Sequence, residues 1–176
     1  PGTQLHTALN NVTTSGNTTK GYYAGGQGPT SKIGKIDYSS DTNTLIPSTI
    51  PEVMYRGAGS TNGDGTIGYY VGGNVAPGMS YTSLCTKHVY ATDTISDLTS
   101  GRLYTPKGEV QGSGNQTYAL TAGGYYYPSP TTYSSIDRMT YSNETTSRQP
   151  SNNLHVTRAR GGAHGARTYG RGTTYD

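Results

Sequence analysis

The sequence predicts an all-β protein whose strands are copied along the chain in units of about fifty residues. Its 176 residues include 17 tyrosines and 26 glycines, while hydrophobic residues make up 30% and charged residues 13%. Both fractions are low for a globular domain, in which about 45–50% apolar and about 25% charged residues are usual. Tyrosine favours strands and glycine interrupts them, so this composition is typical of a sheet protein with many turns.

A pair of glycines marks each repeated unit. The pairs are Gly25-Gly26, Gly72-Gly73 and Gly123-Gly124, with spacings of 47 and 51 residues, and they end the stretches GYYAGG, GYYVGG and ALTAGG. Glycine tolerates positive φ and lets two backbones approach closely. We therefore expect a short strand to stop at each pair, against a neighbouring sheet.

A second marker keeps the same period. The segments SKIGKIDYSSDTNT, SLCTKHVYATDTIS and SSIDRMTYSNETTS align without gaps at spacings of 52 and 51 residues. Each has a basic residue, a tyrosine three positions later and an acid three positions after that: Lys35, Tyr38 and Asp41; Lys87, Tyr90 and Asp93; Arg138, Tyr141 and Glu144. Each segment predicts an alternating strand with a polar turn behind it.

These markers predict a single repeat domain over residues 1–176. Its units lie at about 21–67, 68–117 and 118–168, with partial units at 1–20 and 169–176. One thin sheet cannot bury its own face, so successive units must stack on one another.

The glycine pairs and the spaced Tyr38, Tyr90 and Tyr141 resemble the kelch repeat family, although the family's tryptophan is absent from every unit. The third unit is similar to a kelch-like variant seen in phage and viral tail-fibre and virion-associated proteins. The resemblance implies four-stranded antiparallel blades of a kelch-like β-propeller. Since closed propellers have about 4–8 blades, a chain with three full units implies a partial propeller, or one completed by oligomerisation.

No catalytic set, cofactor or metal is predicted. The chain lacks the G-x-S-x-G, H-E-x-x-H and Walker-type phosphate-loop motifs. Copper-radical oxidases share the propeller type, but Cys85 and His88 are three apart on a predicted strand and face opposite sides of it. The stretch around Asn62 and Asp64 is better explained by a turn than by a calcium loop.

The charge and hydropathy patterns indicate neither a nucleic-acid partner nor a membrane. The net charge of +3 is too small to imply a polyanionic partner. The sequence contains no apolar run long enough to predict membrane insertion. Four arginines stand among glycines between Arg158 and Gly172, a composition that can bind single-stranded nucleic acid. However, Arg158 lies on the repeat, at about the place of Arg56 and Lys107, so a structural role is favoured.

The candidate ligand-binding residues are tyrosines of the longer loops in the second and third units: Tyr81, Tyr125, Tyr126, Tyr127 and Tyr133. A tyrosine offers a sugar ring a flat apolar face and a hydroxyl at its polar edge. The alternative for each ring is packing against the next unit. Four sequons provide candidate glycosylation sites at Asn11, Asn17, Asn115 and Asn143.

Three functions remain open. The first is a non-catalytic structural and adhesive module of a virion or extracellular appendage, which displays loops to a host surface or glycan. The second is a subunit of a self-assembling extracellular filament, whose partners are copies of itself or other filament or virion proteins. The third is an enzyme of the copper-radical oxidase type.

Overall fold

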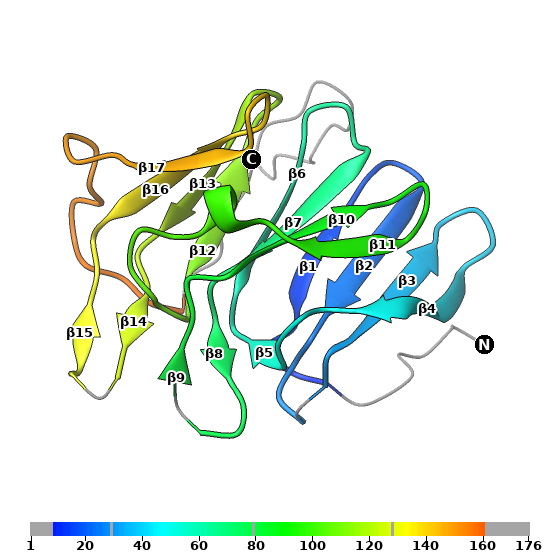
Figure 1. Cartoon of the computed structure of the whole chain (residues 1–176), viewed down its shortest axis with the longest axis horizontal. Helices are drawn as coiled ribbons and strands as arrows, with labels where there is room; N and C mark the ends of the chain where they lie inside the picture. Colours follow the sequence, from blue (N-terminus) through cyan, green and yellow to red (C-terminus); the bar gives the residue numbers. More distant parts are fainter. Residues whose placement is uncertain (1–8, 29, 79, 128, 161–176) are drawn as a thin grey trace, which may run out of the picture.

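The chain is all-β, with its strands arranged mainly in three four-stranded antiparallel sheets. The computed structural model describes residues 9–28, 30–78, 80–127 and 129–160. Figure 1 shows the three sheets side by side in chain order, from blue and cyan through green to yellow and orange.

Each sheet is a meander of four consecutive long strands. The first sheet contains β1 (Thr13–Gly16), β2 (Lys20–Ala24), β3 (Lys32–Asp37) and β4 (Thr42–Thr49). The second contains β6 (Ala58–Thr61), β7 (Ile67–Val71), β10 (Cys85–Val89) and β11 (Thr94–Asp97). The third contains β12 (Gln111–Gly114), β13 (Tyr118–Ala122), β16 (Ile136–Thr140) and β17 (Thr145–Arg148). The tyrosine- or leucine-containing strand before each glycine pair is therefore the second strand of its sheet.

Shorter elements project from one end of the sheets, at the lower edge of Figure 1. The strands β8 (Asn74–Val75) and β9 (Ser80–Tyr81) form a hairpin, and β5 (Met54–Tyr55) pairs with β8. A second hairpin joins β14 (Tyr125–Tyr126) and β15 (Thr131–Thr132). The 3-10 turn η1 (Thr99–Gly101) follows β11 and lies away from this edge. Both hairpins are insertions between the second and third strands of a sheet.

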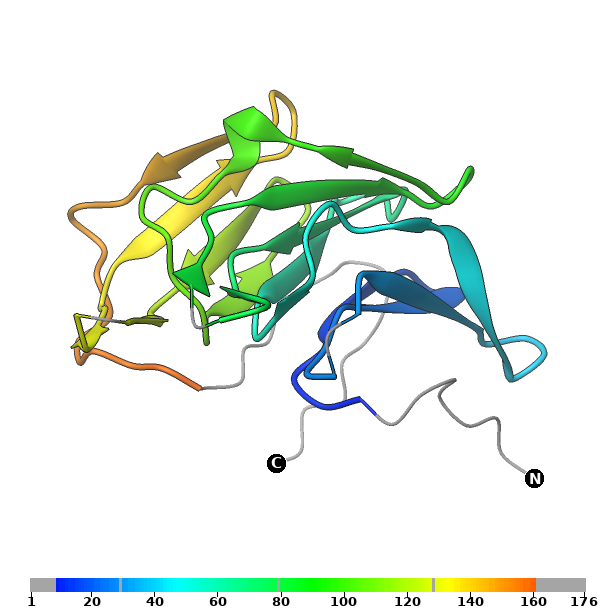
Figure 2. The ribbon, with the colours of Figure 1, turned by 60° about the horizontal axis from the view of Figure 1, so that its bottom comes forward.

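The sheets are stacked so that their first strands meet. β6 contacts both β1 and β12, which places the first strands of all three sheets on one side of the assembly. Figure 2 shows the sheets layered one on another from this second direction. The described residues form no closed ring of sheets, so the outward faces of the first and third sheets lie at the two ends of the stack.

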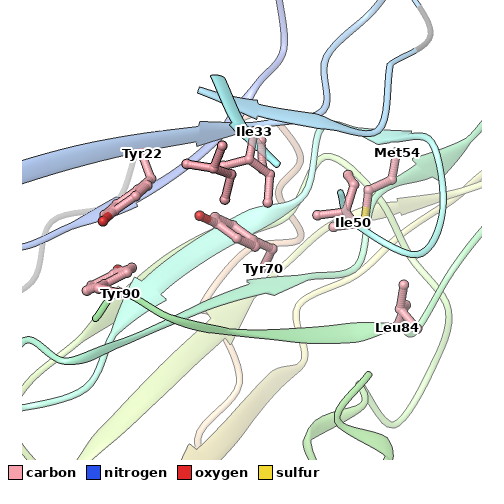
Figure 3. Packing of buried hydrophobic residues seen from close by; sticks show 9 residues of the cluster. Tyr22, Ile33, Ile50, Met54, Tyr70, Leu84 and Tyr90 are labelled. Carbon is pink, nitrogen blue, oxygen red and sulfur yellow. The ribbon is translucent and has the colours of Figure 1, made fainter. Parts of the chain in front are cut away.

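Tyrosines fill the space between the first and second sheets. Tyr22 and Tyr90 stack with ring centroids 4.6 Å apart and an interplanar angle of 10°, beside the buried Tyr70 (Figure 3). Ile33, Ile50, Met54 and Leu84 complete this core (Figure 3). A tyrosine ring supplies apolar area while its hydroxyl is hydrogen-bonded, as Tyr70 is by Ser15 at 2.9 Å.

The second and third sheets share the same kind of contact. Tyr69 stacks on Tyr141 with ring centroids 5.6 Å apart and an interplanar angle of 11°. Cys85 and Met139 are buried in the same cluster. Burial raises the pKa of the Cys85 thiol to about 12, which keeps it protonated and unreactive. Val71, Leu103 and Ala119 fill the rest of this interface.

The glycine pairs allow a following segment to cross close to each sheet. All three pairs have positive φ, with values of 64°, 65° and 65° at the first glycines Gly25, Gly72 and Gly123. The second glycine of each pair donates its N–H to the carbonyl of Met54, Lys107 or Arg158, at 3.1, 3.0 and 2.8 Å. A Cβ on Gly25 would lie only 2.0 Å from the Met54 carbonyl oxygen. A side chain at this position is therefore incompatible with the crossing.

Candidate ligand-binding pocket

A pocket of about 610 Å³ opens at the end of the molecule that carries the hairpins. Its lining combines aromatic rings with amide and charged groups: Gln27, Tyr55, Arg56, Asn74, Tyr81, Glu109, Tyr125, Tyr127, Ala159 and Arg160. These residues come from all three units of the chain. The volume lies within the range of about 300–1,000 Å³ that is usual for small-molecule sites.

Two hairpins position the aromatic wall. Tyr81 ends β9 and Tyr125 begins β14, and their ring centroids lie 6.2 Å apart at an interplanar angle of 68°. Gly108 forms an isolated bridge with Tyr125, and a Cβ on Gly108 would lie 3.0 Å from the Tyr81 ring. The Tyr81 ring therefore lies against the Gly108 backbone, and the bridge ties the backbone of Tyr125 to the same residue. Burial raises the pKa of Tyr81, so its phenol stays neutral and can donate a hydrogen bond.

Glu109 is the carboxylate of the pocket and is held by two arginines. Its side chain is only 4% exposed, with Arg56 Nη1 at 2.8 Å and Arg160 Nε at 3.0 Å. Two guanidinium groups around one carboxylate leave one net positive charge at this wall. Arg160 is largely exposed, so part of that charge faces the pocket and solvent.

The backbone fixes this charged cluster through a repeated conformation. Asn11, Arg56, Glu109 and Arg160 all have positive φ, between 57° and 61°. The N–H groups of Arg56, Glu109 and Arg160 each donate to the carbonyl of the preceding member of the series, at 2.9, 2.8 and 3.1 Å. These residues are therefore equivalent positions of successive units, and Asn11, Arg56 and Glu109 each lie two residues before the first strand of a sheet.

The predicted tyrosines divide into two groups. Tyr81, Tyr125 and Tyr127 line the pocket, and Tyr127 is exposed. Tyr126 does not line it but packs on Tyr81, with ring centroids 5.7 Å apart. Tyr133 lies with its ring centroid 5.9 Å from Lys107 Nζ, above a buried ion pair.

Arg56, Asn74, Glu109 and Arg160 were not anticipated as site residues. The internal repeat of the sequence aligns Arg56 with Lys107 and Arg158. In the structure, the second glycines of the three pairs donate to Met54, Lys107 and Arg158, so Met54 is the equivalent of these two residues. Arg56 instead corresponds to Glu109 and Arg160, two residues further on. The stretches before the first strand of each sheet share too few residues for this register to be read from the sequence.

Three candidate glycosylation sites lie in tight turns. The Oδ1 atoms of Asn17, Asn115 and Asn143 accept hydrogen bonds from the N–H groups of Thr19, Thr117 and Thr145, at 2.9, 2.8 and 3.2 Å. Each asparagine therefore caps its own hairpin turn. Asn11 is exposed and donates to Gln27 Oε1 at 3.0 Å. The modification itself stays a prediction.

The residues considered for copper or calcium binding have structural surroundings. In the described part of the chain, no group of three or more His, Cys, Asp or Glu side chains is arranged to hold a metal ion. Cys85 belongs to the core beside the third sheet, whereas His88 packs on Tyr22 beside the first. Asn62 and Asp64 both accept the N–H of Thr66 at 3.0 Å and so stabilise a hairpin turn.

No helix in the described ranges has the length and apolar character needed to cross a membrane. The arginine- and glycine-rich stretch lies outside the described residues beyond Arg160.

The chain matches no model of a known protein family and none of the curated protein sequences.

Proposed function

We propose that this chain is a non-catalytic, kelch-like propeller module of a virion or extracellular appendage, and that it binds a glycan in the pocket between its hairpins. The observation that carries the proposal is the convergence of Tyr81, Tyr125 and Tyr127 with Glu109 and Arg160 around one cavity. Three sheets of equal topology, stacked in chain order, support the propeller part of the proposal.

A sugar fits the chemistry of this wall. Tyrosine faces pack on the apolar side of a pyranose ring, and their hydroxyls hydrogen-bond at its edge. The carboxylate, amide and guanidinium groups opposite the rings offer acceptors and donors for ring hydroxyls. A few placed polar groups within an aromatic wall are the usual basis of specificity in small-ligand sites.

The net positive charge favours sugars that carry a carboxylate. Arg56 and Arg160 each give one contact to Glu109, which leaves N–H donors on both guanidinium groups. Guanidinium binds carboxylate in a planar, two-bonded geometry. A uronic or sialic acid is therefore the ligand class that the pocket suits best.

Binding is tested by screening the purified chain against immobilised acidic and neutral oligosaccharides, followed by calorimetric titration of the hits. We expect saturable binding that Tyr127→Ala weakens by about tenfold, since an aromatic contact is worth about 1–2 kcal/mol. Tyr104→Ala is the matched control, because Tyr104 is also exposed but lies outside the pocket.

Specificity for the acidic class is tested with Arg160→Gln. We expect this variant to lose its preference for carboxylate-bearing sugars while neutral sugars bind as before. If no oligosaccharide binds, or if Tyr127→Ala and Tyr104→Ala have equal effects, the proposed function is wrong.

A further inference from the structure

One contact is built twice between the sheets of this chain. At the first interface, Lys35 and Tyr22 of the first sheet approach Asp93 of the second, and Tyr22 Oη lies 3.4 Å from Asp93 Oδ1. At the second interface, Lys87 Nζ and Tyr69 Oη lie 2.7 and 3.0 Å from Glu144 Oε1.

The same contact includes a ring from the later sheet. Tyr90 stacks on Tyr22, and Tyr141 stacks on Tyr69. Each interface thus joins a cation and an aromatic ring of the earlier sheet to an acid and a tyrosine of the later one. The two halves are different surfaces, so the contact has a direction along the chain.

The outward face of the third sheet presents the cation of the first half, with Leu120 in place of the aromatic ring. Arg138 lies opposite Leu120 in the register of β16 and β13, as Lys35 lies opposite Tyr22 and Lys87 opposite Tyr69. Residues opposite one another in an antiparallel pair share a face. Arg138 is partly exposed, and its guanidinium carbon lies 5.7 Å from the centroid of the Tyr118 ring, which holds the cationic group at this face.

The outward face of the first sheet presents the second half. Tyr38 is 52% exposed, although its equivalents Tyr90 and Tyr141 are stacked on a preceding sheet. Its hydroxyl lies over Gly21 as that of Tyr90 lies over Gly68, which confirms that the positions are equivalent. Asp41 is exposed beside it and has the same positive φ as Asp93 and Glu144, at 51°, 52° and 53°.

From this complementarity we propose that the third sheet of one copy docks on the first sheet of a second copy, in the register of the internal interfaces. Arg138 of one copy then meets Asp41 of the next, and Leu120 packs on Tyr38. The partner is a second copy because this chain itself carries both halves, with matched charges and matched register. The inference does not depend on sugar binding.

Docking in this register also places two segments in one location. Asn11 and Arg160 are equivalent positions, so the entry segment of the incoming copy and the segment at Arg160 of the first copy compete for the same site. One of them moves aside when the copies join. The contact is therefore concentration-dependent and weaker than the two covalently linked internal interfaces.

Sedimentation velocity over a range of protein concentrations tests the proposal. We expect a species of at least twice the 18.6 kDa chain mass that forms as concentration rises. Arg138→Asp and Asp41→Arg each weaken the association by about tenfold or more, because each brings like charges together. The two changes combined in one chain recreate an opposite pair and restore association.

Charge reversal at another exposed ion pair provides the control. Arg102 Nη2 lies 2.7 Å from Asp97 Oδ2, away from both docking faces, so Arg102→Asp leaves association unchanged. Circular dichroism confirms that each variant is folded. A chain that stays monomeric at every concentration overturns the proposal. So does a combined variant that associates no better than its parents.

Discussion

Lys87 Nζ lies 2.7 Å from Glu144 Oε1, which joins the third strand of the second sheet to the outer turn of the third sheet. Lys35 and Asp93 are joined in the same way one unit earlier. The basic and acidic residues that define the sequence period therefore do not meet within a unit. Lys35 and Lys87 each pair with the acid of the following unit, so the sequence period is the period of the contact between sheets.

The stacked tyrosines are part of that contact. Tyr69 is buried, stacks on Tyr141 and donates to Glu144, so we expect Tyr69→Ala to lower the free energy of unfolding by about 3–5 kcal/mol. Tyr69→Leu costs about 1–2 kcal/mol, because leucine occupies the equivalent place at Leu120 but lacks the hydroxyl and the ring. Denaturant titration measures both. Equal costs for the two variants would contradict a role for apolar packing here.

A buried ion pair behaves differently from the partly exposed ones. Lys107 and Asp137 are 0% and 2% exposed, with Nζ and Oδ2 3.1 Å apart. We expect Lys107→Met alone to cost about 3–5 kcal/mol, since it leaves a buried carboxylate unpaired. Adding Asp137→Thr recovers most of this loss, because Met54 and Thr86 hold the equivalent places in the preceding units. Denaturant unfolding of both variants provides the test, and a double variant no more stable than the single one contradicts it.

His88 makes the stability depend on pH. Burial lowers its pKa from 6.5 to about 4, an effect that the nearby Asp93 only partly offsets. Between these values the unfolded chain binds more protons than the folded one. The free energy of unfolding therefore falls as the pH drops from about 6.5 to about 4, by up to about 3 kcal/mol.

The variant His88→Met isolates this effect from the titration of carboxylates. Ile36 and Met139 occupy the equivalent positions in the other sheets, so a methionine fits here. We expect the loss of stability in this pH range to be smaller in the variant than in the parent chain. Parallel pH curves for the two proteins would show that His88 is not responsible.

The first glycines of the three pairs allow a comparison at constant backbone geometry. Their φ values lie within one degree, but an added Cβ would lie 2.0 Å from a carbonyl oxygen at Gly25, 2.4 Å at Gly123 and 2.8 Å at Gly72. Alanine in this conformation costs about 1–2 kcal/mol by itself. We expect thermal melts to show the largest loss for Gly25→Ala and the smallest for Gly72→Ala. Equal losses would mean that the crossing segment yields freely.

The sequence period was sufficient to predict sheets in equal units, because glycine pairs and the spaced tyrosines are local signals. The partners of these residues could not be predicted. Nothing in the spacing of Lys35, Tyr38 and Asp41 tells whether the lysine pairs within its unit or with the next one. That choice depends on how neighbouring sheets stack, which is a property of three-dimensional packing.

The pocket was only partly predictable for the same reason. Tyr81, Tyr125 and Tyr127 stand in loops whose length and tyrosine content mark them. Tyr126 and Tyr133 carry the same signal but contact Tyr81 and Lys107 instead. Glu109 and its two arginines come from stretches 51–53 residues apart that share no motif, and only the backbone path brings them together.

A double-mutant cycle on Lys87 and Glu144 tests most directly whether successive sheets are held by one repeated contact. Both side chains are partly exposed, so solvent screens the pair and each single charge reversal should cost about 1–2 kcal/mol. Lys87→Glu combined with Glu144→Lys should cost less than the sum of the single changes by about 1 kcal/mol or more. Strictly additive costs would show that the two residues do not interact across the sheets, contrary to this account.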